Sequence, residues 1–398
     1  MLLLQSLPLS TAAPVAALLL LVAASLAFLL LRPRGRSLVL SAWPAPAWLY
    51  IQALAAVTKR PSKQKGAPAG DKMIQVVLSR AVHFSAPRLR RYLSLADFTG
   101  GTAGDVPLMY PIVEAFRLVM QAMLLPAFPF NVLGSVLGGT RVVAMRRIGA
   151  EEKLQYSCRV DPAFRTTPKG HTEVDIAVEA HAVGPGAGAP AAGAEAAAGA
   201  AAGGSQLVWR SVTTVIILSQ RRARREPPAA AAAGAEKAPA GPAAEGATAA
   251  EGESVSTKPT VIDTWQLGPD TGRRYGTLNG DLNPIHLYPA TSALFGFKRP
   301  IAHALYLTGR AEASLRKAGL ELRYPCALTA EFKRPTLLPA TLHCAWLAGA
   351  TGGAKGGAAA LDSPTGARFA VLTSDLSKEV LVGSVSTAKA AVDKAMAA

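Results

Sequence analysis

The sequence predicts an α+β protein in which two similar folded units follow an N-terminal membrane helix. An uncharged apolar run occupies residues 15–31, and two later parts of the chain, 72–222 and 259–390, share one order of elements. In each part a helix candidate precedes several segments in which apolar and polar residues alternate. A helix followed by antiparallel strands is the order of an α+β unit, so two such units are expected.

The N-terminal run has the length and composition of a membrane anchor. Residues 15–31 are almost continuously apolar, and a helix of that length spans about 25 Å, close to the hydrocarbon thickness of a bilayer. Arg32, Arg34 and Arg36 follow the run, whereas a cleaved signal peptide carries its positive charge ahead of it. We therefore assign residues 1–36 to a single-pass anchor. The positive-inside rule then places the bulk of the chain on the cytosolic side, and an organelle membrane is also compatible with the pattern.

Residues 37–71 are predicted to form a juxtamembrane basic segment. Its first part, 37–58, is uncharged and contains prolines and aromatic residues, namely Trp43, Pro44, Pro46, Trp48 and Tyr50. This composition favours a segment at the membrane interface, and a hairpin through the membrane is the alternative. Basic residues follow between 59 and 65. Both predicted cores lie further along the chain, so we expect a chain without residues 1–70 to be soluble and active.

The overall composition excludes several classes of protein. The chain has 398 residues, 50% of them hydrophobic, which is enough for two buried cores. Its three cysteines are far apart and odd in number, which argues against a disulfide framework or a metal cluster and favours a reducing compartment. The net charge is +16, but aromatic residues make up only 6% and no nucleic-acid-binding module is recognisable. We therefore expect neither a nucleic-acid partner nor a metal ion.

Stretches rich in alanine, glycine and proline divide the remaining chain. Residues 223–258 form the predicted linker between the units. Two further stretches, 184–204 and 349–360, each lie between strand-like segments. We interpret them as enlarged hairpin tips and expect antiparallel pairing across each.

The N-terminal unit, 72–222, is predicted to be non-catalytic. Its helix candidate covers residues 107–125, where apolar side chains recur at helical spacing: Leu108, Ile112, Phe116, Met120 and Met123. We interpret the methionines as core residues, with a channel for an acyl tail as the alternative. The unit's histidines, His83, His171 and His181, have no carboxylate at the loop spacing found in the second unit.

The C-terminal unit contains the most informative motif, the run GDLNPIH at 280–286. It places a carboxylate, Asp281, and an imidazole, His286, in one short stretch with Asn283 between them. Glycine opens the run and proline stiffens it, which favours a well-defined loop over a helix. A carboxylate paired with a histidine is a common device for general acid–base catalysis near neutral pH. The alternative is a plain turn, because Asp, Asn and Pro are all turn residues.

The sequence around this run resembles the signature of MaoC-like, hydratase-2-type enzymes, which have the hotdog fold. An aromatic residue, Tyr275, precedes the run, and Pro-Ile-Ala-His at 300–303 leads into a helix candidate at 304–318. Downstream, residues 331–340 resemble that family's "FKRP…LP" strand. The resemblance covers about residues 260–388.

Two details refine the resemblance. Residues 127–134 resemble the first half of a double hotdog, so two hotdog units are expected in one chain. The family usually has His-Gly at the helix start, where this chain has His303-Ala304. An alanine keeps the backbone N–H, but its methyl group takes space that glycine leaves open.

The resemblance implies an enzyme of the lyase class that needs no cofactor. The implied reaction is the reversible hydration of a trans-2-enoyl thioester to the (R)-3-hydroxyacyl thioester in fatty-acid metabolism, with coenzyme A or acyl carrier protein as the carrier. Asp281 and His286 would share the acid–base work, supported by Asn283 and Gly280. The backbone N–H of Ala304, at the helix start, would stabilise the negative charge that develops on the thioester oxygen.

Other expectations are less specific. Arg299, Lys333 and Arg334 are candidates for contacts with the phosphates of coenzyme A or with an acidic carrier protein. His303 is interpreted as a structural histidine that packs the helix start. A homodimer is compatible with the sequence. Two other functions stay open: a hotdog thioesterase, against which the Asp-x-Asn-Pro-x-His run argues, and a non-catalytic, membrane-tethered acyl-thioester binder.

Overall fold

The computed structural model describes residues 35–55, 73–99, 104–133, 135–168, 170–183, 205–218, 259–347 and 366–397. The predicted anchor helix at 15–31, the linker at 223–258 and the inserts at 184–204 and 349–360 lie outside these ranges. None of the helices in the described ranges is both long and apolar enough to cross a membrane.

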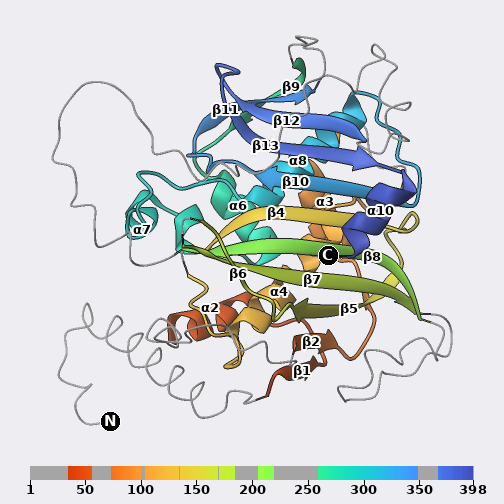
Figure 1. Cartoon of the computed structure of the whole chain (residues 1–398), viewed down its shortest axis with the longest axis vertical. Helices are drawn as coiled ribbons and strands as arrows, with labels where there is room; N and C mark the ends of the chain where they lie inside the picture. The colour runs from red at the N-terminus through yellow and green to blue at the C-terminus, as the bar shows by residue number, and fades with distance from the viewer. Residues whose placement is uncertain are drawn as a thin grey trace.

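One 13-stranded sheet extends through both units (Figure 1). The N-terminal unit contributes β1 (Ser37–Leu40), β2 (Ile74–Leu78), β3 (Val82–His83), β4 (Val136–Ala144), β5 (Lys153–Val160), β6 (Arg165–Thr166), β7 (Thr172–Val183) and β8 (Ser205–Ile217). The C-terminal unit contributes β9 (Thr260–Leu267), β10 (Cys326–Phe332), β11 (Ala340–Trp346), β12 (Ala367–Thr373) and β13 (Glu379–Ser386). The strand order is β1-β2-β5-β7-β8-β4-β10-β13-β12-β11-β9, with β3 paired to β5 and β6 to β7.

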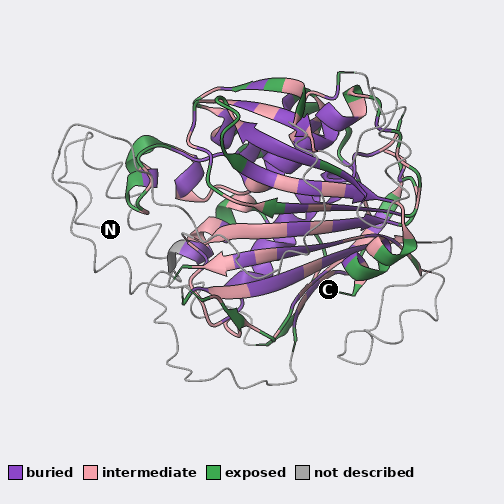
Figure 2. Ribbon diagram, turned by 45° about the horizontal axis from the view of Figure 1, so that its top comes forward, coloured by how far each residue is buried: buried purple, intermediate pink, exposed green. Residues whose placement is uncertain are grey.

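Two central helices lie against one face of this sheet. They are α4 (Tyr110–Leu124), which is buried at every residue, and α8 (Ala304–Lys317). The shorter helices are α2 (Pro46–Ala55), α3 (Ala86–Leu95), α6 (Thr271–Asn279), α7 (Pro289–Ala293) and the 3-10 helix η3 (Pro284–His286). The last helix, α10 (Lys389–Met396), packs on the opposite face over β4 and β10. Figure 2 shows the buried residues concentrated between the sheet and the two central helices. Two helices, each wrapped by antiparallel strands, form the double hotdog arrangement expected from the sequence.

Several predicted elements are confirmed. The helix predicted at 107–125 is α4, and the helix predicted at 304–318 is α8, after which Gly319 adopts a φ of 91°. Strands β7 and β8 pair antiparallel on either side of the first insert, and β11 pairs antiparallel with β12 on either side of the second. The methionines of α4 are core residues, since Met120 and Met123 are 5% and 4% exposed.

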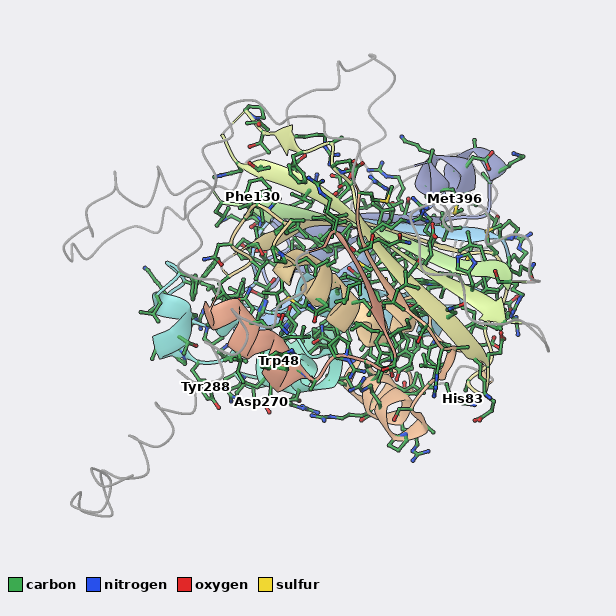
Figure 3. All side chains as sticks on the ribbon, turned by 90° about the horizontal axis from the view of Figure 1, so that it is seen from below. Trp48, His83, Phe130, Asp270, Tyr288 and Met396 are labelled. Carbon is green, nitrogen blue, oxygen red and sulfur yellow. The ribbon has the colours of Figure 1, made fainter. Side chains whose placement is uncertain are left out.

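The segment at 37–55 has a different place from the one predicted. Its composition predicts a segment at the membrane interface, whereas β1 pairs in parallel with β2 and α2 packs on α4. Leu49 and Ala53, one helical turn apart, are completely buried, and this apolar stripe explains why α2 joins the core. Trp48, on the other face of α2, is 39% exposed (Figure 3). Residues 37–55 therefore belong to the N-terminal unit, and the expectation that residues 1–70 are dispensable loses its basis.

The two units are joined by a strand pair and by a buried carboxylate. Strand β4 pairs antiparallel with β10, which turns two sheet edges into an interior ladder. Glu312 of α8 is 1% exposed and accepts hydrogen bonds from the backbone N–H groups of Leu108 and Met109, at 2.8 and 3.1 Å. It thus stabilises the start of α4 from the neighbouring unit, while Arg316 balances its charge at 2.6 Å.

We expect Glu312→Gln to lower the free energy of unfolding by about 2–4 kcal/mol, because a neutral amide offers one acceptor and leaves Arg316 without its counter-charge. Urea unfolding followed by circular dichroism measures the change. The control is Lys389→Ala, which removes an exposed ion pair with Asp393 and should leave the free energy of unfolding nearly unchanged. Equal effects of the two variants would show that the buried carboxylate does not hold the units together.

Candidate active site

The loop that carries Asp281 begins with a left-handed glycine. Helix α6 ends at Asn279, and Gly280 follows with a φ of 86° and donates its N–H to the Gly276 carbonyl at 2.8 Å. A Cβ atom on Gly280 would lie 3.0 Å from Cγ of Arg117 on α4. Both the positive φ and the close approach of Arg117 therefore favour glycine at this position. The left-handed backbone of Gly280 reverses the direction of the chain, and Asp281 lies back along α6.

Two glycines of α6 allow the loop to lie directly on the helix. A Cβ on Gly272 would be 2.2 Å from the carbonyl oxygen of His286, and a Cβ on Gly276 would be 2.4 Å from that of Asp281. The two glycines are one helical turn apart and so face the same way. The backbone of the loop is thereby fixed at both of the residues predicted to be catalytic.

Hydrogen bonds complete the loop. Asn279 accepts from the Asp281 N–H at 2.8 Å, and Asp281 Oδ1 accepts from the Asn283 N–H at 3.1 Å. The side chain of Asn283 accepts from the Ile285 N–H at 3.5 Å, and its carbonyl accepts from the His286 N–H at 3.0 Å. Asn283 thus caps η3 and organises the loop.

His286 is held in one tautomer. It is 7% exposed, and its Nδ1 lies 2.7 Å from the carbonyl oxygen of Ile301. A carbonyl only accepts, so Nδ1 carries the hydrogen and Nε2 keeps a lone pair. The Ile301 N–H in turn donates to the Ile285 carbonyl at 3.0 Å, which joins η3 to the segment that precedes α8. Burial lowers the pKa of His286, and the charge of Asp281 opposes this shift. The imidazole is therefore neutral near pH 7 and able to accept a proton at Nε2.

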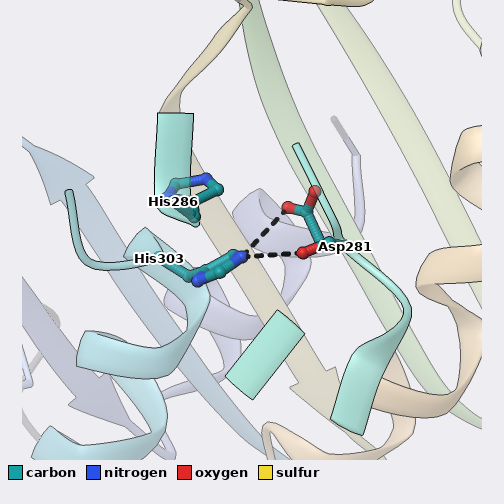
Figure 4. A group of neighbouring side chains, drawn as sticks. All are labelled: Asp281, His286 and His303. Atoms are coloured by element: carbon teal, nitrogen blue, oxygen red, sulfur yellow. Dashed lines mark hydrogen bonds and ion pairs between the residues drawn. The ribbon is translucent and has the colours of Figure 1, made fainter. Parts of the chain in front are cut away.

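The structure also places His303 in the site. Its ring stacks on His286 with the centroids 3.6 Å apart, and it is 4% exposed. Its Nε2 lies 3.1 Å from the carbonyl oxygen of Asp281 and 3.6 Å from Oδ2 of the same residue (Figure 4). Burial, reinforced by His286, lowers the pKa of His303 well below its usual value. The sequence predicts His303 only as a structural histidine at the helix start, and its contact with Asp281 depends on tertiary packing.

Asp281, His286 and His303 each offer one donor atom within 4.8 Å of the others, a grouping that resembles a metal-ligand set. The tautomer of His303 argues against that use. Its Nε2 faces a carbonyl oxygen and so carries the hydrogen, while its Nδ1 has no hydrogen-bond partner among the described residues. To bind a metal ion together with Asp281, the His303 ring would have to turn so that the lone pair of its Nδ1 points toward Asp281. The expectation of a metal-free site stays a prediction.

One residue of the site comes from the segment that the sequence analysis placed beside the membrane. The hydroxyl of Tyr50, on α2, donates to Oδ1 of Asp281 at 3.1 Å. Burial raises the pKa of Tyr50, and the neighbouring carboxylate raises it further, so the hydroxyl keeps its proton. No local pattern linked Tyr50 to the loop, because the two residues are 231 positions apart.

The remaining predicted residues lie as follows. Ala304 is the first residue of α8, directly after the N-cap His303, and is partly exposed. Its N–H belongs to the first turn, where a helix offers no internal acceptor. Arg299 is exposed, the ammonium group of Lys333 pairs with Glu331, and Arg334 donates to the Glu379 carbonyl at 2.7 Å. A role of these three side chains in phosphate binding stays a prediction.

The N-terminal unit has a histidine next to a carboxylate, but in a different setting. His181 Nε2 lies 3.6 Å from Glu179 on the same strand, β7. Glu179 also pairs with Arg159 and with Arg210, so its charge is balanced by two guanidinium groups. This cluster is an ion-pair network across β5, β7 and β8 and lacks the loop of the second unit.

Together, the double hotdog arrangement and a half-buried carboxylate beside a buried imidazole on a rigid loop form a site in the C-terminal unit that suits acid–base chemistry. Residues 247–356 match the family described as "MaoC like domain". A curated relative, 3-hydroxyacyl-thioester dehydratase X of Mycobacterium tuberculosis, is 26% identical over 249 residues, covering 62% of this chain and 71% of the relative. Residues 247–356 therefore carry a MaoC-like domain, as the sequence predicted, and the likeness to a dehydratase agrees with the predicted enzyme of the lyase class.

Solved structures agree in fold. The crystal structure of HtdX from Mycobacterium tuberculosis superposes with a TM-score of 0.54 at 20% identity, covering 79% of this chain and 99% of that chain. A MaoC-like dehydratase from Phytophthora capsici superposes with a TM-score of 0.50 at 15% identity, covering 80% of this chain and 96% of that chain. These likenesses extend over both units and support the double hotdog fold.

We expect Gly276→Ala to lower kcat at least about 100-fold, because the new methyl group would displace the Asp281 carbonyl, and displacements near 1 Å have effects of this size. Alanine favours a helix by about 1 kcal/mol, but that gain cannot relieve a clash with backbone. The matched control is Gly149→Ala, whose Cβ would meet only the Glu152 side chain at 3.7 Å. Steady-state kinetics on purified, folded variants decides, and normal turnover by Gly276→Ala would contradict the proposed fit between helix and loop.

Proposed function

We propose that the protein catalyses the reversible hydration of trans-2-enoyl thioesters to (R)-3-hydroxyacyl thioesters. The observation that carries this proposal is the pair Asp281 and His286, held with their acceptor atoms less than 4.8 Å apart on one rigid loop. The dehydratase named among the relatives acts on 3-hydroxyacyl thioesters, by its name, which supports the same substrate class here. A role in fatty-acid metabolism follows from this substrate class.

The pair suits the activation of one water molecule. Asp281 offers a carboxylate oxygen and His286 offers the lone pair of Nε2, so both are acceptors. A water molecule makes hydrogen bonds of about 2.8 Å, so it can donate to two acceptors that are 4–5 Å apart. In the hydration direction the pair removes a proton from this water as its oxygen bonds to C3. A proton is then delivered from the pair to C2, and dehydration reverses both steps.

The electrons displaced from the double bond move to the thioester oxygen, which therefore needs a hydrogen-bond donor. The N–H of Ala304 at the start of α8 is the donor that we propose, since it has no acceptor within the helix and lies next to His303. The helix dipole adds to the stabilisation of negative charge at this end. Because the water lies on one side of the acyl chain and the thioester oxygen is fixed at the start of α8, only one face of the double bond is attacked. The choice of the (R) product rests on the family resemblance.

The carrier and the acyl tail are further parts of the proposal. Coenzyme A or acyl carrier protein carries the thioester, and Arg299, Lys333 and Arg334 are the basic side chains proposed to meet its phosphates. The N-terminal unit, which is proposed to be non-catalytic, holds the acyl tail beside α4. The physiological direction of the reaction depends on the concentrations of substrate and product, since the same site serves both.

Asp281→Asn and His286→Ala should each lower kcat for hydration of crotonyl-CoA and of a long-chain enoyl-CoA by about 10²- to 10⁴-fold. The double variant should be little worse than the slower single variant, because both groups act on one water. His83→Ala, at an exposed histidine of the N-terminal unit, serves as the control and should retain full activity. A folded single variant with near-normal turnover would refute the assignment of the pair.

Ala304→Gly should leave turnover unchanged or raise it, whereas Ala304→Val should lower kcat sharply. Only the backbone N–H is used, and a larger side chain beside it crowds the thioester oxygen. The measurement is kcat and KM on the same two substrates, with thermal melting as the check of folding. Full activity of the valine variant would place the donor elsewhere.

The N-terminal anchor is also a proposal, supported by the apolar run at 15–31. The full chain should fractionate with membranes, and a chain lacking residues 1–34 should be soluble and active, because β1 and α2 remain. A chain lacking residues 1–70 should be inactive, since it loses Leu49, Ala53 and Tyr50 from the fold and the site. Fractionation with an activity assay tests both statements. Full-length protein in the soluble fraction would refute the anchor, and an active shorter chain would refute the role of α2.

A further inference from the structure

We propose that Tyr50 is a positioning residue of the active site, which orients the Asp281 carboxylate and stabilises its charged form. The proposal rests on the proposed function, in that Asp281 is taken as one of the two acid–base groups. It assigns a part of the site to the segment at 37–55, which carries no motif of its own.

The two oxygens of Asp281 have different surroundings. Oδ1 accepts from the Tyr50 hydroxyl at 3.1 Å and from the Asn283 N–H, also at 3.1 Å. Oδ2 faces the edge of the His303 ring at 3.6 Å. Two donors on Oδ1 fix the plane of the carboxylate, and Oδ2 is left as the oxygen that faces the imidazoles. Only the side-chain donor can be removed by mutation.

The packing of α2 against α4 and the catalytic loop fixes the position of Tyr50. Its neighbours Leu49 and Ala53 are completely buried, and Gln52, 2% exposed, accepts from the Gln121 amide of α4 at 3.4 Å. At the start of α2, Pro46 lies against Gly280, where a Cβ on the glycine would be 3.5 Å from the proline ring. The helix therefore contacts both α4 and the first residue of the catalytic loop, and the hydroxyl of Tyr50 has a fixed position.

The charge state of the tyrosine suits this role. Burial raises the pKa of Tyr50, and the charge of Asp281 acts in the same direction, so the phenol is a donor at every pH of enzymatic interest. A donor to a carboxylate favours the charged form and lowers its proton affinity. The other titratable residues around Asp281 are Tyr275 on α6, His286, His303, and Arg117, whose side-chain carbons lie behind Gly280 while its guanidinium faces Glu114. All four are unchanged when only the Tyr50 hydroxyl is removed.

The test is Tyr50→Phe in the full chain, with Tyr324→Phe as the matched control at a half-buried tyrosine outside the site. Phenylalanine keeps the ring and its packing, and thermal melting confirms that both variants fold. We expect Tyr50→Phe to lower kcat for crotonyl-CoA hydration about 10-fold or more, with KM changed less than about twofold, since hydrogen bonds to charged groups have effects of this order. The control should behave like the unmodified protein.

The split between kcat and KM separates positioning from simple packing. Without the donor the carboxylate is free to rotate, so kcat falls while KM and the melting temperature stay nearly unchanged. The hydrogen bond is also measured without substrate, by the ¹³C NMR resonance of the Asp281 carboxyl in protein labelled at aspartate. Asp281→Asn identifies this resonance by its loss, Tyr50→Phe should move it, and Tyr324→Phe should not. If the unmodified protein hydrates no enoyl thioester, the proposed function fails, while the resonance still decides the role of Tyr50. An unmoved resonance and an unchanged kcat would overturn the inference. Faster turnover by Tyr50→Phe would overturn it as well, because it would show that the hydroxyl occupies the place of the reacting water.

Discussion

The proposed active site depends on the contact between the glycine face of α6 and the backbone of the loop at 280–286. Gly272 and Gly276 leave room for the carbonyls of His286 and Asp281 at distances that no side chain tolerates. The carbonyl of Ile301 fixes the imidazole of His286 from the other side. The acid–base pair is thus positioned mainly by backbone, which has less freedom than side chains, and such preorganisation lowers the cost of reaching the reactive geometry.

Burial of the two imidazoles determines their charge. His286 and His303 are both buried and stack at 3.6 Å, a distance at which two charged imidazoles would repel strongly. Burial lowers the pKa of each, so the stacked rings are neutral. His286 offers an acceptor at Nε2 and His303 turns a donor toward Asp281, so the site can hold a polar water beside neutral rings, which fits chemistry on an uncharged double bond.

The parts of the site that the sequence predicted are local in the chain. Asp281, Asn283 and His286 share one turn, and the helices and hairpins around them follow from hydrophobic spacing and from the inserts. His303 and Tyr50 could not be assigned in the same way, because their contacts with Asp281 depend on tertiary packing. The place of Tyr50 could not be predicted from its neighbours either, because prolines and aromatic residues are as typical of a membrane interface as of a short helix that packs on a core. Helix α4 could be predicted from the spacing of its apolar residues. Nothing in the local sequence shows that Glu312 of the other unit accepts hydrogen bonds at its start.

The joint between β4 and β10 has a consequence for synthesis on the ribosome. Strand β4 ends at Ala144, and its partner begins at Cys326, so 182 residues separate the two edges (326 − 144). At translation rates of about 5–20 residues per second, the edge of β4 waits about 10–40 s for its partner. During that interval β4 is paired only on its β8 side, and its other edge is a template for association with other chains. Slow translation of the intervening residues would lengthen this exposure, so a chaperone that covers the edge of β4 until β10 emerges would favour correct folding.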